Sequence, residues 1–169
     1  MKKIILLLTL FFVAFATCLA KDYYLEIHFI DIGEGDSILI RAENESALID
    51  TGNLLSGPKL VDYLTRNNIT TIKHLIITHH HLDHIMGVFF VMPKFKIENA
   101  YDNGFILGIA NNEIFGYYEK IFRSKENYHI LREGDRLKLG DSLLEVIWPP
   151  DKSLSGSISF VSVFRSPLR

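Results

Sequence analysis

Cysteine is nearly absent from this sequence. Its 169 residues contain one, Cys18, which lies inside an apolar N-terminal run. A single thiol cannot form a disulfide within the chain, and it cannot supply the several thiolates of a structural zinc site. Any metal ion must therefore be bound by histidine and carboxylate side chains.

An excess of positive charge is also missing. Lys and Arg number 18 against 20 Asp and Glu, a formal net charge of −2. A negative surface argues against broad electrostatic capture of nucleic acid, although it does not exclude a phosphate substrate held by metal ions in a cleft. The sequence has no internal repeat, low-complexity tract or linker, so its length predicts one domain.

The N-terminus is basic and then apolar. Lys2 and Lys3 precede an uncharged run, and Cys18 and Ala20 are small residues at its end. This pattern predicts a signal peptide over residues 1–20 and an extracytoplasmic (secreted or periplasmic) domain over 21–169, with no stable membrane insertion after cleavage. Cleavage would leave 16 basic and 20 acidic side chains, a net charge of −4. Two alternatives are an uncleaved membrane anchor and a lipoprotein cut before Cys18.

Hydrophobic patterning predicts a mixed α/β fold with layers of sheet and helix. Helices are expected over residues 58–67, 83–91 and 113–123, the second ended by Pro93 and the third burying Ile114, Tyr117, Tyr118 and Ile121. Strands are expected over residues 25–31, 37–41, 47–49, 72–78, 97–101 and 158–164, with a hairpin formed by 137–139 and 143–148.

The stretch THHHLDHIMG, Thr78 to Gly87, contains four of the seven histidines. In an extended loop, residues two apart point the same way, so His79 and His81 project together and His80 points elsewhere. Asp83 and His84 follow as the chain turns into a helix. Two pairs of ligands suit two metal ions about 3.5–4 Å apart.

Imidazole and carboxylate donors favour zinc, with manganese or iron as alternatives. A divalent ion lowers the pKa of bound water to about 7, and Asp83 could both ligate the metal and orient that water as the catalytic carboxylate. The structural alternative is a surface histidine cluster, or a helix cap formed by Asp83. The isolated histidines His28, His74 and His129 are expected to have structural or surface roles.

Three motifs in this order resemble the metallo-β-lactamase superfamily. Thr78–Gly87 resembles its histidine signature, and Leu48–Gly52 (LIDTG) resembles the motif that closes its early strands. His28–Ile40 (HFIDIGEGDSILI) resembles the opening of the branch related to the hydrolase-like domain of ComEC, a DNA-uptake competence protein. The resemblance covers roughly residues 25–165.

The resemblance implies an αββα sandwich with the metal site at one edge. His79 and His81 would bind the first metal, and Asp83 and His84 the second. Asp50 would hydrogen-bond behind the ligands and position their loop. Asp31, Gly33, Gly35 and Asp36 would form a turn near the site. The implied function is an exported hydrolase acting on small-molecule or phosphodiester substrates, with nucleic acid as one candidate that the charge does not support.

The resemblance also implies a later aspartate that bridges the metals and a last histidine. No residue between Trp148 and Arg169 matches them, so we expect mainly the N-terminal half of the fold, incomplete at the C-terminus. Such a chain would be a catalytically inactive remnant or a metal-binding module, or would complete its site as a homodimer. A metal scavenger would explain the histidine loop but not the other two motifs.

Overall fold

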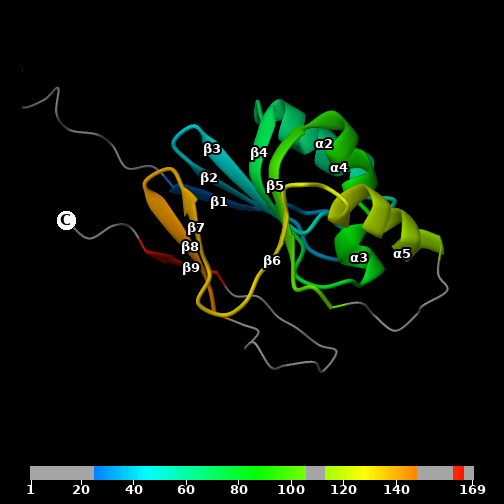
Figure 1. Ribbon diagram of the computed structural model, residues 1–169. Helices are drawn as coiled ribbons and strands as arrows, with labels where there is room; N and C mark the ends of the chain where they lie inside the picture. Colours follow the sequence, from blue (N-terminus) through cyan, green and yellow to red (C-terminus); the bar gives the residue numbers. More distant parts are fainter. Residues whose placement is uncertain (1–24, 106–112, 148–161, 166–169) are drawn as a thin grey trace, which may run out of the picture.

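The computed structural model describes residues 25–105, 113–147 and 162–165 (Figure 1). The expected signal peptide over 1–20 and the first part of the strand expected over 158–164 lie outside these ranges. Within them, no helix combines the length and apolar character that a membrane span requires.

A six-stranded sheet forms the centre of the molecule, in the order β1-β2-β3-β4-β5-β6. The strands are β1 Leu25–Phe29, β2 Ile38–Ala42, β3 Glu45–Ile49, β4 Thr71–Ile76, β5 Lys96–Asp102 and β6 Tyr128–Ile130. The first three pair antiparallel, and β3 to β6 pair parallel. The carboxyl ends of β3, β4 and β5 therefore meet at one edge of the sheet.

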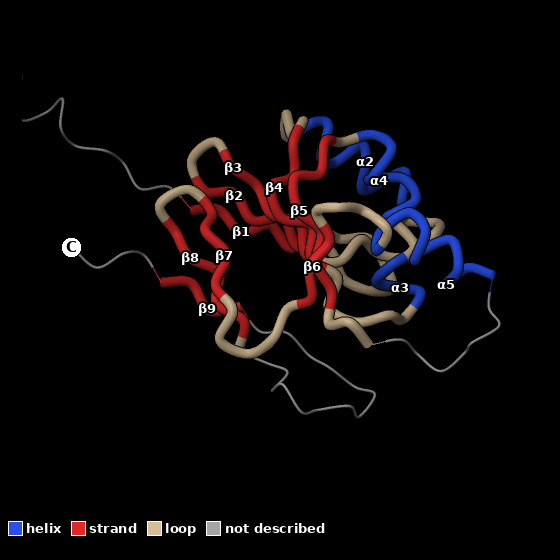
Figure 2. Tube along the Cα trace, viewed as in Figure 1, coloured by secondary structure: helices blue, strands red, loops and turns tan. Residues whose placement is uncertain are grey.

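Helices cover one face of this sheet (Figure 2). They are α2 Gly57–Arg66, α3 Leu82–Ile85, α4 Val88–Lys94, α5 Glu113–Tyr118 and the π-helical turn η1 Glu119–Arg123. Pro58 suits the first turn of α2, and Leu60 and Leu64 are fully buried against the sheet. Leu39, Leu48 and Leu75 supply the sheet side of this core.

A second sheet packs on the opposite face, with the order β7-β8-β9. Its strands are β7 Arg136–Leu139, β8 Ser142–Val146 and β9 Ser162–Arg165. Leu139, Leu144 and Val146 form a second core with Ile40 and Ala47 of the first sheet. Helices, first sheet and second sheet make three successive layers, which confirms the predicted α/β layered fold.

Two polar side chains tie the sheets together. His74 on β4 lies 2.9 Å through Nε2 from the carbonyl oxygen of Lys138 on β7. The Glu45 carboxylate accepts a hydrogen bond from the backbone N–H of Gly140, in the β7–β8 turn, and another from Lys73. Buried apolar contacts and these hydrogen bonds thus hold the β7–β8 hairpin against the first sheet.

The structure corrects several element predictions. The helix expected over 83–91 is divided into α3 and α4 around Gly87, and Pro93 lies inside α4 instead of ending it. The helix expected over 113–123 changes to π geometry at Glu119. Tyr117, which was expected to face the core, is 59 % exposed, so that part of the prediction is wrong.

Candidate metal centre

The segment from Thr78 to His84, which carries the predicted metal ligands and is called the ligand loop below, follows the carboxyl end of β4 and lies beside the carboxyl end of β3. Ile49 and Ile76 are paired in the parallel register, so Asp50 and the residues after Ile77 emerge together. The backbone N–H of Asp50 donates to the carbonyl oxygen of Ile76 at 2.8 Å. The strand order therefore places Asp50 behind the loop.

Asp50 binds the start of the loop with both carboxylate oxygens. Its Oδ1 accepts from the backbone N–H of Thr78 at 2.8 Å, and its Oδ2 accepts from the Thr78 hydroxyl at 2.6 Å. The side chain is 2 % exposed, and its φ of 55° lies in the left-handed region that aspartate tolerates better than most residues. These contacts agree with a positioning role for Asp50.

The four predicted ligand residues lie next to one another beyond Thr78. His79 Nε2 lies 3.0 Å from His81 Nδ1, and the ring centroids of His79 and His84 are 4.0 Å apart. His84 Nε2 lies 3.6 Å from Asp83 Oδ2. The predicted ligands are thus in contact pair by pair, and His84 is the one that also belongs to a group of three potential ligand atoms within 4.8 Å of one another.

Asp50 also orients His84. His84 Nδ1 lies 2.9 Å from Asp50 Oδ2, so an Nδ1–H donates to the carboxylate and leaves Nε2 facing Asp83. Burial raises the pKa of Asp50 against the opposing effect of bonds from His84 and Thr78. Burial opposes protonation of His84, but the hydrogen bond to Asp50 and its charge raise the pKa of this imidazole. The hydrogen bond to Asp50 therefore fixes the orientation of the His84 ring.

The electrostatics suit a metal ligand at His79. Burial, together with the charges of His84 and His81, lowers the pKa of His79 to about 4. Its imidazole is neutral at pH 7, which is the form that binds a metal ion. The neutral donor on His79, the fixed ring of His84 and the carboxylate of Asp83 together fit a divalent cation.

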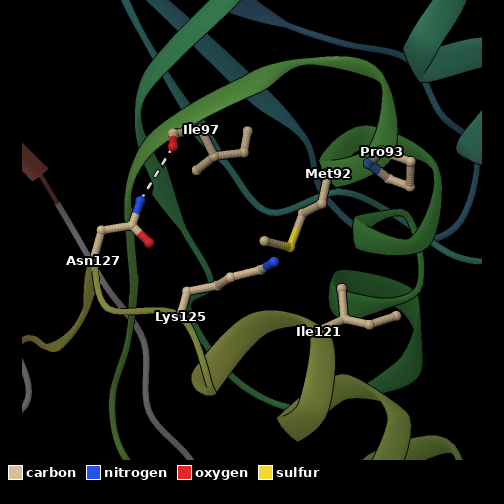
Figure 3. Close-up of a pocket in the computed structure, with 6 residues that line it drawn as sticks. All are labelled: Met92, Pro93, Ile97, Ile121, Lys125 and Asn127. Carbon is tan, nitrogen blue, oxygen red and sulfur yellow. Dashed lines mark hydrogen bonds between the residues drawn. The ribbon is translucent and has the colours of Figure 1, made fainter.

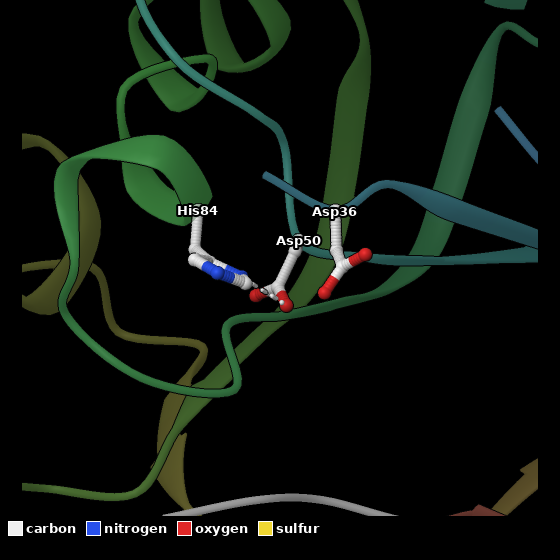
Figure 4. A group of neighbouring side chains, drawn as sticks. All are labelled: Asp36, Asp50 and His84. Atoms are coloured by element: carbon white, nitrogen blue, oxygen red, sulfur yellow. Dashed lines mark hydrogen bonds and ion pairs between the residues drawn. The ribbon is translucent and has the colours of Figure 1, made fainter. Parts of the chain in front are cut away.

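Asp36 is a further acidic residue at this centre. One oxygen each of Asp36 and Asp50 and one ring nitrogen of His84 lie within 4.8 Å of one another (Figure 4). The sequence placed Asp36 in a turn near the site but gave it no role as a ligand. Its position after Gly35, at the end of the loop between the first two strands, was the available signal.

Two glycines permit the close packing of this region. A Cβ on Gly35, whose φ is +91°, would overlap the backbone carbonyl of Asp83. A Cβ on Gly87 would overlap the backbone carbonyl of Thr51, and Gly87 N–H donates to Gly52. The loop before β2 and the loop after β3 therefore lie directly against the α3 segment. This contact explains the break between α3 and α4.

The other histidines lie apart from the ligand group. His28 contacts Tyr63 and Glu26, and His74 lies between Tyr101 and Lys138. His129 packs its ring near Tyr101. His80, between two ligand residues, points into the protein interior and is 3 % exposed, as the alternation predicts.

A separate hollow of about 350 Å³ opens at the other end of the first sheet (Figure 3). It is lined by Met92, Pro93, Ile97, Ile121, Lys125 and Asn127. Ile97 lies at the start of β5, whereas the ligand loop follows the end of the parallel strand β4. The residues that line this hollow include no histidine or carboxylate.

Comparison with known proteins gives consistent matches. The family model of the Metallo-beta-lactamase superfamily matches residues 30–160 of this chain. ComE operon protein 3 of Bacillus subtilis is 27 % identical over 169 aligned positions, which cover 85 % of this chain and 21 % of that protein. Hydroxyacylglutathione hydrolase 1 of Vibrio vulnificus is 28 % identical over 109 positions, which cover 64 % of this chain and 36 % of that protein. The chain thus spans about a fifth to a third of these curated relatives.

Among solved structures, a HARLDQ-motif mutant of a metallo-beta-lactamase from Cronobacter sakazakii aligns with a TM-score of 0.54. The identity is 16 %, and the alignment covers 81 % of this chain and 57 % of that one. At this identity the likeness concerns the fold.

Proposed function

The chain belongs to the metallo-beta-lactamase superfamily, and we propose that it is an exported metal-dependent hydrolase. One observation supports the proposal: neighbouring members of the set His79, His81, Asp83 and His84 contact one another after β4, and Asp50 hydrogen-bonds to His84 behind them. Export is proposed from the N-terminal pattern of residues 1–20, with a membrane anchor as the alternative.

The chemistry follows from the donor set. His79 and His81 would hold one ion, and Asp83 with His84 a second, with zinc expected and manganese or iron as alternatives. A bound divalent ion supplies Lewis acidity and lowers the pKa of coordinated water to about 7. Asp83 would orient that water toward the substrate, and Asp50 keeps Thr78 and His84 in place.

The substrate class is proposed from the relatives. ComE operon protein 3 is named for a competence operon, which favours a phosphodiester, including nucleic acid. The similarity to Hydroxyacylglutathione hydrolase 1 favours a small-molecule ester as the substrate instead. The net charge of −2 gives no general attraction for a polyanion, so binding of a phosphodiester would depend on the metal ions.

The first experiment measures metal content and hydrolysis together. The 169-residue chain would be analysed for zinc, manganese and iron, and assayed with bis(p-nitrophenyl) phosphate and with a hydroxyacylglutathione. We expect up to two ions per chain, and turnover that His81→Ala abolishes. His129→Ala, a matched change at an exposed histidine, would leave both unchanged. Turnover that survives His81→Ala would sink the proposal.

A metal-binding module without catalysis is the second candidate. Four side chains give two donors per ion, whereas catalytic zinc sites take three from the protein. The missing metal-binding donors could come from Asp36 or from a second chain in a homodimer. Metal bound without turnover on either substrate would favour the module.

A further inference from the structure

His80 is the one side chain of the ligand loop that enters the core between two proposed ligands. Its ring lies 3 % exposed against Tyr118, with a centroid separation of 5.3 Å. Its Nε2 lies 3.1 Å from Asp102 Oδ2 and 3.0 Å from an Nη2 of Arg123. A neutral imidazole nitrogen either donates or accepts, so each tautomer ties the ring to one of these two groups.

Asp102 is the centre of a buried polar cluster at the end of β5. It is fully buried, and its Oδ2 accepts from Arg123 Nε at 2.8 Å and from the Tyr118 hydroxyl at 3.1 Å. Its Oδ1 accepts from the Tyr128 hydroxyl at 2.7 Å and from the backbone N–H of Gly104 at 2.6 Å. Burial opposes its ionisation, but bonds from His80 and Arg123 hold the pKa of Asp102 well below its usual range.

Arg123 reaches this cluster from the π-helical turn η1. Its Nη2 also donates to the carbonyl oxygen of Phe105 at 2.9 Å, which fixes the guanidinium on a second side. A π-helical turn is rare and frequently occurs at functional sites. Here it directs Arg123 from the surface helix towards the back of the ligand loop.

The same region holds the loop by one more bond. Asn103, next to Asp102, donates through Nδ2 to the carbonyl oxygen of Thr78 at 3.1 Å. The N–H and hydroxyl of Thr78 are bound by Asp50 from the other side. The loop is therefore fixed on both sides, by Asp50 near the ligands and by the end of β5 behind them.

We propose that His80, Asp102 and Arg123 are positioning residues that fix the spacing of His79 and His81 through the side chain between them. Rotation of the loop about its own axis would move His79 and His81 out of place together, and the buried His80 ring opposes that rotation. This inference rests on the proposed metal site. It makes the β5–η1 region a support of the proposed metal centre.

The test uses Co²⁺ as the probe, titrated into the 169-residue chain and followed by visible absorption. His80→Phe keeps the ring and its burial but loses both polar contacts. We expect metal affinity to fall 10- to 100-fold, in the range observed for groups that orient metal ligands, with a changed cobalt spectrum. His80→Gln restores an amide that can donate to Asp102, and we expect it to recover most of the affinity.

Two further variants keep the test decisive. Tyr128→Phe removes a bond to the other oxygen of Asp102, so it should lower the unfolding temperature and leave the cobalt spectrum unchanged. If His80→Phe does not fold, Arg123→Lys takes its place in the test. It keeps the charge but cannot contact Asp102, His80 and Phe105 together, so we expect it to weaken cobalt binding at least several-fold.

The outcomes separate this inference from the function. Cobalt binding that is lost in His81→Ala but unchanged in His80→Phe and Arg123→Lys would leave the proposed metal site standing and overturn the positioning role. A wild-type chain that binds no cobalt would overturn both.

Discussion

At the scale of single residues, the centre depends on contacts that tolerate no extra atom. Gly35 and Gly33 both have positive φ, +91° and +82°, but only Gly35 lies against another backbone segment, that of Asp83. The pair therefore separates two effects of adding a side chain, which are the strain of a left-handed conformation and a collision with the ligand loop.

We expect Gly35→Ala to lower both stability and metal affinity. An alanine in the left-handed region costs about 1–2 kcal/mol, and the collision with Asp83 adds to this and displaces a proposed ligand. Gly33→Ala is the matched control, because a Cβ there meets no atom within 4 Å. It should lose stability and keep its affinity. Thermal unfolding and zinc titration measure the two quantities, and equal affinities in the two variants would contradict the role of Gly35.

Asp50 is the second residue whose loss we expect to matter. Asp50→Asn keeps the shape but can no longer accept from both Thr78 and His84 with a charged carboxylate. Metal affinity should fall about 10- to 100-fold, as for other carboxylates behind a metal-binding histidine. Calorimetric titration with Zn²⁺ provides the measurement. Affinity equal to that of the wild type would remove Asp50 from the positioning role.

At the scale of elements, His74 joins β4 to the second sheet in its neutral form. Nε2–H donates to the carbonyl oxygen of Lys138, and Nδ1 accepts from the Tyr101 hydroxyl, so a single ring proton is enough for both hydrogen bonds. Burial, the largest influence, lowers the pKa of His74 below 6.5. As pH falls through 6.5, the unfolded chain gains a proton that the folded chain refuses, and stability decreases.

The corresponding prediction concerns pH 5 to 7. We expect the unfolding temperature of the wild type to drop as pH falls through this window, and His74→Gln to show a shallower drop, because its amide does not titrate. His79, whose pKa is lowered to about 4, contributes the same trend in both proteins. Thermal unfolding at several pH values provides the comparison, and parallel curves would show that His74 does not carry the effect.

At the scale of the whole molecule, the described part of the chain exposes an apolar strip on β1. Leu25, Ile27 and Phe29 on β1 are 39 %, 41 % and 80 % exposed, and they pair with Ala42, Ile40 and Ile38, whose side chains face the second core. β1 also ends the strand order of its sheet. Because an apolar face on an edge strand favours association, we propose that this strip would form the interface if the chain is a homodimer.

Phe29→Lys should therefore shift the chain towards monomer. The charge would disfavour burial of the strip, while the ligand loop is untouched. Tyr117→Lys, at an exposed aromatic on α5, is the matched control and should leave self-association unchanged. Sedimentation velocity over a range of concentrations measures the effect. A wild-type chain that stays monomeric throughout would refute the prediction.

The sequence by itself determined most of the local order of strands and helices, although it did not predict β6, and it identified the loop that carries the proposed ligands. Alternation placed His79 and His81 on one side and His80 on the other, because side-chain direction in an extended segment depends only on the backbone. The layered fold followed from the same short-range patterns.

Only the tertiary structure decided which distant groups meet that loop. Asp36 and Gly35 approach from before β2, while Asp102 and Arg123 approach from β5 and η1. The π turn and the division between α3 and α4 depend on contacts between segments far apart in the chain, and no local pattern contains them. Asp50 and His84, 34 positions apart, come within 2.9 Å because β3 and β4 lie parallel, and that pairing places the centre at the edge of the sheet.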